Sequence, residues 1–401
     1  MKPRIVMLGI MGRTPFAGVA WQVLHYLEGL RRLGADVYYV EDTGEWAYDA
    51  ERETFTDDHR YPVRYVGRLM DWAGLADRWA YRAGGKDGAV FGLSERQLGD
   101  VFDRADALVN LTGATVLRDE HLRVPTRIYV ETDPILPQVE IAQGRQFTID
   151  FLGAHTHHFT FGENLGTPEC RIPTDGFAYI HTRQPVVLDW WRATRPAPAG
   201  ARGPRVGGAY AGAAPRFTTI ASWRQTGKDV EWNGQVYAWS KHHQFVKFIE
   251  LPRRAGVTLE LALARVDAAA LAELARHGWR VTDAVALSRD HLPYRDYIIA
   301  SDAEFTVAKD QYVLPRSGWF SDRSACYLTA GKPVITQDTG FGRVLPTGRG
   351  LFAFQSMDDI VAAVEAITTD PGAHAKAAQE IAAEFFDAER VVGRLLAAAG
   401  L

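Results

Sequence analysis

Apolar and polar positions alternate along the chain in the manner of an α/β protein. The run RIVMLGI at 4–10 is apolar almost throughout, as expected of a strand buried on both faces of a sheet. A stripe of apolar residues at helical spacing follows and ends near Gly34. We predict further strands in this half at 36–42, 106–113, 126–134 and 159–164. The segment from about 43 to 99 is rich in Trp and Tyr, and we predict that it is an irregular insertion.

The second half repeats this alternation. Strand-like runs lie at 217–223, 257–263, 279–284, 303–309, 332–338 and 350–354. A helix is predicted between two of them, at 267–278. Strands separated by helices are typical of parallel sheets. We therefore predict an α/β fold with two Rossmann-like domains that face one another across a cleft.

A segment rich in Pro, Ala, Gly and Arg separates the two halves. It covers 192–205, and its composition favours a linker over a packed core. The predicted organisation is a first domain at 1–191, this linker, and a second domain at 206–380. Residues 381–401 are predicted to form a C-terminal helix that packs back on the first domain. Ligands of such folds bind beyond the carboxyl ends of the strands.

Composition narrows the classes of function. The chain has 401 residues, of which 47% are hydrophobic and 23% charged, and its net charge is −4. This balance argues against a broad basic face and hence against a nucleic-acid partner. The two cysteines, Cys170 and Cys326, form no C-x-x-C motif, which argues against a disulfide framework or a cysteine zinc site. With no apolar run long enough to span a membrane, we expect a cytoplasmic protein.

Cations gather at the predicted strand ends of the second half. Arg224 and Lys228 follow the strand at 217–223, and Lys309 closes the strand at 303–309. Because parallel strands end at one edge of a sheet, these side chains are expected to converge. A planar guanidinium and a point-like ammonium both suit a diphosphate. The sequence has no G-x-x-x-x-G-K-[ST] and no G-x-G-x-x-G after a strand, so nucleotide hydrolysis and dinucleotide oxidoreduction lose their usual support.

The stretch SGWFSDRSACYLTAGKPVITQDTGFG at 317–342 predicts a loop, a helix, a Gly-Lys-Pro corner, a buried strand and a glycine loop. The helix start either is simply capped by Ser321 or Asp322, or forms an anion site. The anion site would use Ser317, Ser321, Arg323 and Ser324. After the strand, Asp338, Thr339 and Gly340 either hold sugar hydroxyls or form a plain turn.

Taken together, these features resemble a GT-B glycosyltransferase, most similar to the large retaining nucleotide-sugar family. In that family a loop, a helix, a Gly-x-Pro-Val corner and a strand build the donor site. An Arg and, a few residues later, a Lys follow the first strand of the second domain and grip the donor diphosphate. The stretch ASWRQTGK at 221–228 supplies Arg224 and Lys228 at matching spacing. The similarity of motifs covers about 216–355.

The sequence departs from that family at its E-x₇-E pair. Counted back from the Gly-Lys-Pro corner, the two positions hold Gly318 and Cys326, so both carboxylates are absent. The donor sugar and the stereochemical outcome therefore stay open. Cys326 is expected to pack inside its helix.

The resemblance implies transfer of a sugar from a nucleoside-diphosphate sugar to a glycan or small-molecule acceptor. Arg224, Lys228 and the Ser321–Ser324 turn would stabilise the leaving diphosphate, with Lys309 in a lesser role. No cofactor is expected beyond the nucleotide-sugar substrate, and no metal is required.

The first half carries the expected acceptor side. Arg13 follows the first strand, in a loop that is either a weak phosphate cradle or an ordinary turn. Glu131 and Asp133 lie at a strand end, where one of them is placed to act as general base in an inverting reaction. His155 is predicted to orient an acceptor hydroxyl, whereas a metal site there lacks a carboxylate at ligand spacing.

Two alternatives stay open. One is a nucleotide-sugar epimerase of the same fold. The other is a non-catalytic sugar-nucleotide-binding protein. A DNA-base glycosyltransferase is disfavoured by the acidic balance and by the lack of a basic stripe.

Overall fold

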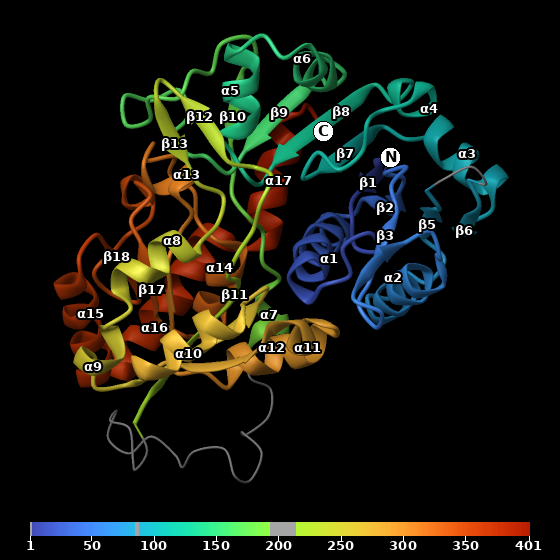
Figure 1. Cartoon of the computed structure of the whole chain (residues 1–401). Helices are drawn as coiled ribbons and strands as arrows, with labels where there is room; N and C mark the ends of the chain where they lie inside the picture. Colours follow the sequence, from blue (N-terminus) through green and yellow to red (C-terminus); the bar gives the residue numbers. More distant parts are fainter. Residues whose placement is uncertain (1, 85–87, 193–213) are drawn as a thin grey trace. The chain divides into compact units, whose positions relative to one another are not determined.

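The structure is a computed structural model that describes residues 2–84, 88–192 and 214–401. It divides into two compact units (Figure 1). The first unit takes in Met1–Gly162, Pro173–Val187 and Ala388–Leu401, and the second takes in Glu163–Ile172 and Leu188–Asp387. Residues 193–205 of the predicted linker lie outside the described residues. Each unit is built on its own mainly parallel sheet, which confirms the predicted α/β class with two Rossmann-like domains.

The described part of the first unit holds a sheet with the strand order β10-β9-β8-β7-β1-β2-β5-β6. Its strands are β1 (Arg4–Leu8), β2 (Asp36–Glu41), β5 (Trp79–Arg82), β6 (Val90–Gly92), β7 (Ala107–Leu111), β8 (Thr126–Glu131), β9 (His157–Thr160) and β10 (Tyr179–His181). Strand β6 runs antiparallel to β5, and the other neighbours are parallel. A separate antiparallel ribbon pairs β3 (Ala47–Asp49) with β4 (Thr54–Thr56).

Helices connect these strands. They are α1 (Ala17–Arg32), α2 (Arg60–Trp72), α3 (Glu95–Asp103), α4 (Asp119–Leu122), α5 (Leu136–Ala142), α6 (Gln146–Gly153) and the C-terminal α17 (Ala388–Ala398). Helix α17 packs against α1 within this unit, and Gly29 allows the close approach. A Cβ on Gly29 would lie 3.0 Å from Val392 Cγ2 and 3.2 Å from the carbonyl oxygen of Ala388. The chain before α17, up to Asp387, belongs to the second unit.

The segment at 43–99 is not the irregular insertion that the sequence predicts. Helix α2 buries Tyr61, Tyr65 and Leu69, which recur every four residues, and β5 joins the main sheet beside β2. Part of the buried face of α2 consists of tyrosines, and β5 has only four residues. The periodic spacing of apolar residues that identifies a helix or a strand is therefore weak in both elements. This segment therefore completes the sheet of the first unit.

The second unit holds a sheet with the order β15-β14-β11-β16-β17-β18 among its described residues, and all neighbouring strands are parallel. The strands are β11 (Arg216–Ser222), β14 (Thr258–Ala264), β15 (Arg280–Asp283), β16 (Ala303–Thr306), β17 (Val334–Gln337) and β18 (Leu351–Phe354). All six were predicted from the sequence. An antiparallel ribbon of β12 (Val230–Trp232) and β13 (Gln235–Tyr237) follows β11.

The helical segments of this unit include short connectors and longer covering helices. They are α7 (Leu188–Trp191), α8 (His242–Phe245), η1 (Val246–Phe248), α9 (Leu251–Arg254), α10 (Ala268–Arg276), α11 (Ala284–Ser288), α12 (His291–Ile299), α13 (Asp310–Val313), α14 (Asp322–Thr329), η2 (Phe341–Arg343), α15 (Met357–Thr369), α16 (Pro371–Ile381) and the π-helical η3 (Ala382–Phe386). Among the described residues, no helix combines the length and apolar character needed to cross a membrane.

Aromatic side chains fill the core beneath the strand ends of the second unit. Phe305 stacks on Phe354 with ring centres 5.6 Å apart, and Trp279 and Phe245 contact Phe305 from other elements. Each fully buried aromatic ring contributes roughly 1.5–3 kcal/mol to stability. The loops that leave this edge of the sheet therefore start from a rigid base.

Candidate functional site

Two lysines from different strand ends of the second unit meet at one tryptophan. The ammonium nitrogen of Lys309, just beyond β16, lies 3.0 Å from the ring centre of Trp239. The ammonium nitrogen of Lys228, in the loop after β11, lies 5.1 Å from the same ring centre. The face of an aromatic ring attracts cations and itself carries no formal charge. The sequence predicted this convergence of Lys228 and Lys309.

A third lysine extends this group. Lys241 Nζ lies 5.9 Å from the ring centre of Trp319, which in turn stacks on Tyr312 at 4.2 Å. Tyr312 also meets Lys309, whose Nζ lies 3.2 Å from the phenol oxygen. Lys241 and Lys309 are 7% and 8% exposed. We call these six residues the lysine–aromatic cluster: Lys228, Lys241, Lys309, Trp239, Tyr312 and Trp319.

Buried hydrogen bonds fix the loop that carries Lys228 and Trp239. Gln311 on α13 is fully buried and donates its amide N–H to the carbonyl oxygen of Lys228. The Ser240 hydroxyl donates to the carbonyl oxygen of Trp223 at 3.1 Å, and Asp229 accepts from the backbone N–H of Trp239 at 2.7 Å. The cluster is therefore held in place by contacts within this unit, which suits a binding site that needs preorganised charge.

Arg224 lies at the same edge of the sheet but outside the cluster. Its side chain is 55% exposed, and its Nε lies 3.4 Å from a carboxylate oxygen of Asp267, which follows β14. An exposed ion pair of this kind is worth 1 kcal/mol or less, on the order of thermal energy, so it yields readily to a ligand.

The serines of the 317–324 stretch are buried rather than presented to solvent. Ser317 Oγ donates to the carbonyl oxygen of Tyr312 at 3.3 Å and accepts from the backbone N–H of Trp319. Ser321 is the N-cap residue of α14, but its side chain makes no capping hydrogen bond. Ser324 is fully buried, and its hydroxyl has no hydrogen-bond partner in the structure. Of these three serines, Ser317 is the one whose hydrogen bonds show a structural role: they shape the loop that carries Trp319.

Arg323 points into the domain, so its side chain is not presented to an anion as the sequence predicts. Its Nε donates to Glu304 at 2.7 Å, and its other nitrogens donate to the carbonyl oxygen of Ile220 and to the Thr306 hydroxyl. Glu304 is fully buried. The carboxylate of Glu304 requires a counter-charge in the core, and Arg323 supplies it, so this arginine ties α14 to the sheet.

The turn after β17 is held mostly by its own neighbours. Asp338 accepts from the backbone N–H of Gly340 at 2.7 Å and from Arg316, and these contacts hold the pKa of the Asp338 carboxyl below its usual value despite partial burial. Thr339 is buried and donates to the carbonyl oxygen of Trp319. Gly340 has φ 88°, and a Cβ there would lie 2.5 Å from Asn164 Nδ2. The turn therefore positions the Trp319 loop of the lysine–aromatic cluster.

The two positions of the missing E-x₇-E pair are both structural. Gly318 has φ 78°, and a Cβ there would lie 2.7 Å from the backbone nitrogen of Asn164. Cys326 is 3% exposed, and burial raises the pKa of its thiol well above the usual value. As expected, Cys326 packs inside its helix.

In the first unit, Glu131 and Asp133 have different surroundings. Glu131 is 1% exposed and accepts from the Thr160 hydroxyl at 2.5 Å and from Gln138 Nε2 at 2.8 Å. Burial raises the pKa of the Glu131 carboxyl to about 8. Asp133 is exposed. Of these two carboxylates, Asp133 is therefore the one exposed to solvent.

His155 uses both ring nitrogens inside the first unit. Nδ1 lies 3.0 Å from the carbonyl oxygen of Phe151, and Nε2 lies 3.1 Å from Asn110 Nδ2. A ring that donates from Nδ1 and accepts at Nε2 is neutral, and burial lowers the pKa of His155 to about 4. Since His155 is 5% exposed, the structure does not present it to an acceptor.

Arg13 lies in a loop whose backbone donors are already occupied. The buried carboxylate of Glu41 accepts from the N–H of Gly12 at 2.7 Å and from the N–H of Arg13. Burial raises the pKa of Glu41 to about 7. The Arg13 guanidinium pairs with Glu45. A carboxylate therefore fills the place where a phosphate would bind in a glycine-rich loop, which favours the ordinary-turn interpretation of this segment.

The sequence analysis missed Trp239, Lys241, Tyr312 and Trp319. Trp239 and Lys241 stand in the stretch YAWSKHH, well beyond the end of β11, and no fixed spacing links them to Lys309. The available signal was the concentration of Trp and Lys in the loop that returns from the β12–β13 ribbon. The conformation of that loop, which brings Trp239 over Lys309, cannot be predicted from the sequence pattern.

Comparison with known proteins identifies structures with a similar fold but no protein of similar sequence. No family model matches the sequence, and no curated protein matches it. A glycosyltransferase from Rickettsia africae ESF-5 is similar in structure, with a TM-score of 0.58 at 9% identity over 99% of this chain and 98% of that one. An alpha-glucosyltransferase, solved in complex with UDP and a 13-mer DNA, gives 0.59 at 8% identity over the whole of both chains. Anabaena Alr3699/HepE, solved with UDP and glucose, gives 0.56 at 12% identity over 99% of each chain.

These similarities extend across both units. At such low identities they establish the fold, whereas the chemistry must be argued from the residues. The chain thus has the GT-B fold of these glycosyltransferases, as its sequence predicts.

Proposed function

We propose that the protein is a glycosyltransferase that takes a sugar from a nucleoside-diphosphate sugar. The observation that carries the proposal is the lysine–aromatic cluster at the carboxyl edge of the second unit's sheet. Three ammonium groups lie there, two of them over one indole ring, in a chain with the GT-B fold. A diphosphate is the ligand that three neighbouring cations suit best.

The cluster would act on the leaving group. Glycosyl transfer breaks the bond between the sugar's anomeric carbon and a phosphate oxygen, through a transition state with oxocarbenium character. Negative charge builds up on the departing diphosphate, and Lys228 and Lys309 would stabilise it because their ammonium groups are already in place. Arg224, released from Asp267, would add a bidentate contact. No step in this scheme requires a metal ion.

Uridine nucleotides are the first candidates for the donor. Structures similar in fold were solved with UDP-glucose, namely an alpha-glucosyltransferase and Anabaena Alr3699/HepE. For this chain a UDP-sugar donor is part of the proposal, as is an acceptor that is a carbohydrate or another small molecule.

On the acceptor side, the proposal keeps Asp133 as the candidate general base because its carboxylate is exposed. Glu131 has no direct part because it is buried and bonded to Thr160 and Gln138. His155 has no direct part because its ring is held by Asn110 and Phe151. Ser317, Thr339 and Gly340 would act by positioning Trp319 rather than by touching the donor. The cytoplasm is the proposed location, in keeping with two buried cysteines that form no disulfide.

The test is the thermal stability of the purified chain with UDP, GDP and dTDP, each at saturating concentration. A ligand that binds the folded state raises the unfolding temperature by mass action. The proposal expects one of the three to do so, and the matching sugar nucleotide to release its diphosphate when an acceptor is present. If none of the three shifts the unfolding temperature, the proposed donor site is wrong.

A further inference from the structure

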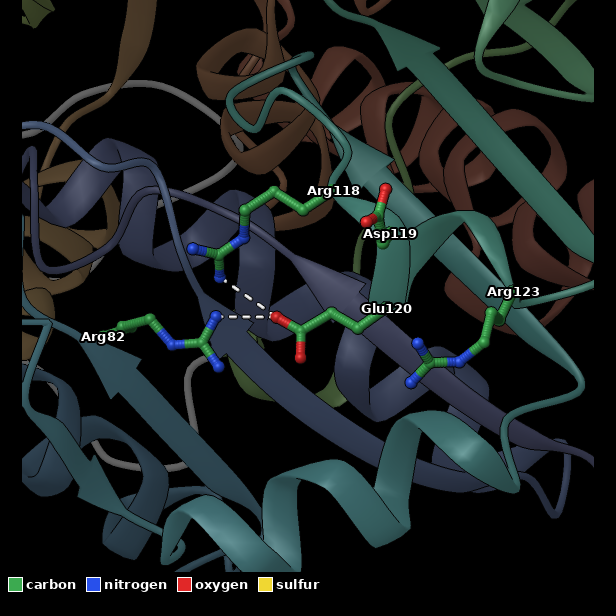
Figure 2. Close-up of a pocket in the computed structure, with 5 residues that line it drawn as sticks. All are labelled: Arg82, Arg118, Asp119, Glu120 and Arg123. Carbon is green, nitrogen blue, oxygen red and sulfur yellow. Dashed lines mark hydrogen bonds and ion pairs between the residues drawn. The ribbon is translucent and has the colours of Figure 1, made fainter.

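The first unit has a charged depression at the carboxyl edge of its own sheet (Figure 2). Its volume is about 630 Å³, and it is lined by Arg82, Arg118, Asp119, Glu120 and Arg123, which we call the arginine depression. Arg82 ends β5, and Asp42 lies just beyond the neighbouring strand β2. The carboxyl edge of a parallel sheet is where ligands of such domains bind.

A buried carboxylate fixes two of the arginines. The Asp42 side chain is 2% exposed and accepts from Arg82 Nη1 at 2.8 Å and from Arg118 Nη2. Two guanidinium groups thus share one buried negative charge, which leaves one positive charge over. Because Asp42 holds them, both groups are oriented before any ligand arrives.

Glu120 supplies a second negative charge from the surface, and the exposed Glu95 lies 3.9 Å from Arg82 Nη2. Its Oε1 accepts from Arg82 Nη1 at 2.7 Å and from Arg118 Nη2 at 3.1 Å, the same two nitrogens that Asp42 uses. Figure 2 shows both guanidinium groups directed at the Glu120 carboxylate, with Arg123 on the other side of Glu120. Unlike Asp42, the Glu120 side chain is 25% exposed and belongs to the short helix α4. Its carboxylate therefore occupies a position that an oxyanion from solvent can take.

We propose that the arginine depression binds the anionic group of an acidic saccharide, whose carboxylate or phosphate replaces the Glu120 carboxylate between Arg82 and Arg118. Arg123, which is 60% exposed and now pairs with Asp103 at 3.1 Å, is available as a third contact. The proposal that an oxyanion binds here depends only on this geometry and not on the proposed function. The identification of the saccharide as the acceptor rests on the proposed function.

A metal ion fits this site less well. Ligand atoms of Asp42, Glu120 and His121 lie within 4.8 Å of one another. However, Arg82 Nη1 stands 2.8 Å and 2.7 Å from the two carboxylates and places a positive charge between them. His121 Nδ1 accepts from the backbone N–H of Arg118 at 3.2 Å, so Nε2 of the neutral ring carries the proton and offers no lone pair.

The experiment is a titration of the full chain, followed by NMR or calorimetry, without any sugar nucleotide. The probes are glucuronate, glucose 6-phosphate and neutral glucose. Replacing Glu120 by Gln removes a negative charge that lies 2.7 Å and 3.1 Å from the two guanidinium groups. We therefore expect about fivefold tighter binding of the acidic sugars and no change for glucose. Arg118→Gln should weaken the binding of the acidic sugars. The better of the two acidic probes in the wild type distinguishes a carboxylate from a phosphate ligand.

Glu51→Gln is the matched control, because Glu51 forms an exposed pair with Arg64 at 2.6 Å elsewhere in the same unit. It should leave all three titrations unchanged. Equal or weaker binding of both acidic sugars to Glu120→Gln would overturn the proposal. Binding of Zn²⁺ that is lost in Glu120→Gln would identify a metal site in its place. Since the test omits the donor, it can succeed even if the proposed transferase activity is absent.

Discussion

The two units place cations at the same edge of their sheets but surround them differently. In the second unit, Lys228 and Lys309 lie against the face of Trp239, which carries no formal charge. In the first unit, Arg82 and Arg118 share the carboxylates of Asp42 and Glu120. A ring face attracts a cation without carrying a formal charge, whereas arginines bonded to carboxylates must exchange one anion for another when a ligand binds.

This difference predicts two kinds of site. The lysine–aromatic cluster brings three ammonium groups together and suits a group with two or more negative charges, such as a diphosphate. In the arginine depression the arginines already pair with carboxylates, so it suits a single oxyanion that takes the place of one carboxylate between two planar guanidinium groups. Cationic side chains near strand ends therefore have different roles, depending on the groups that they pack against.

The largest effect is expected from removing two cations on the donor side. The double change Arg224→Ala and Lys228→Ala should lower kcat/KM by at least about 10³-fold, because each contact to a developing charge is worth about 10²–10³ in rate. Both side chains are exposed, so the fold should survive, which circular dichroism would check. The matched control is Arg253→Ala with Lys247→Ala, both exposed in the same unit. Retained turnover in the double variant would remove the proposed role of these two cations.

Replacing Arg323 is expected to cause a large loss of folding stability. Removing one partner of its buried pair with Glu304 should destabilise the protein by about 3–5 kcal/mol, since Glu304 would be left as a buried charge. Urea unfolding of Arg323→Met measures this, and Arg276→Met, at an exposed pair with Glu273, should change stability by less than about 0.5 kcal/mol. A stable Arg323→Met protein that fails to bind a nucleoside diphosphate would instead restore the anion-site interpretation.

A smaller, pH-dependent effect is expected at Glu131. Burial raises the pKa of this carboxyl to about 8, above its ordinary value near 4.5. The neutral form is therefore favoured in the folded state, and its stabilising contribution, present below about pH 4.5, is lost as the pH rises through 8. Relative to wild type, Glu131→Gln should keep its stability over this range, with a difference of up to a few kcal/mol. Parallel stability–pH curves for the two proteins would contradict this assignment.

The smallest effect is expected from the ring under the lysines. Trp239→Leu removes the π face but keeps an apolar side chain, and a cation–π contact is worth about 0.5–2 kcal/mol. Affinity for the bound nucleoside diphosphate should fall about 2–30-fold, by calorimetry. Trp46→Leu, at an exposed tryptophan of the first unit, should have no effect. If Trp239→Leu binds as wild type, the ring contributes nothing to the placement of the cations.

The sequence predicts the fold well because buried parallel strands are short apolar runs. It predicts Lys228 and Lys309 as neighbours because each follows a strand end, and strand ends of one sheet share an edge. It fails for Arg323, since the position of a residue at a helix start does not reveal that its side chain turns inward to Glu304. It also misses Trp239, whose place over Lys309 depends on the fold of a loop rather than on a periodic pattern.

The most direct test of the donor site is calorimetry of Lys309→Met with the nucleoside diphosphate that stabilises the wild type. Methionine keeps the apolar stem against Trp239 and removes only the ammonium group. A charge-assisted contact is worth about 1.5–3 kcal/mol, so affinity should fall about 10–100-fold, while Lys247→Met, at an exposed lysine of the same unit, should bind as wild type. Wild-type affinity in Lys309→Met would contradict the assignment of the lysine–aromatic cluster as the diphosphate site.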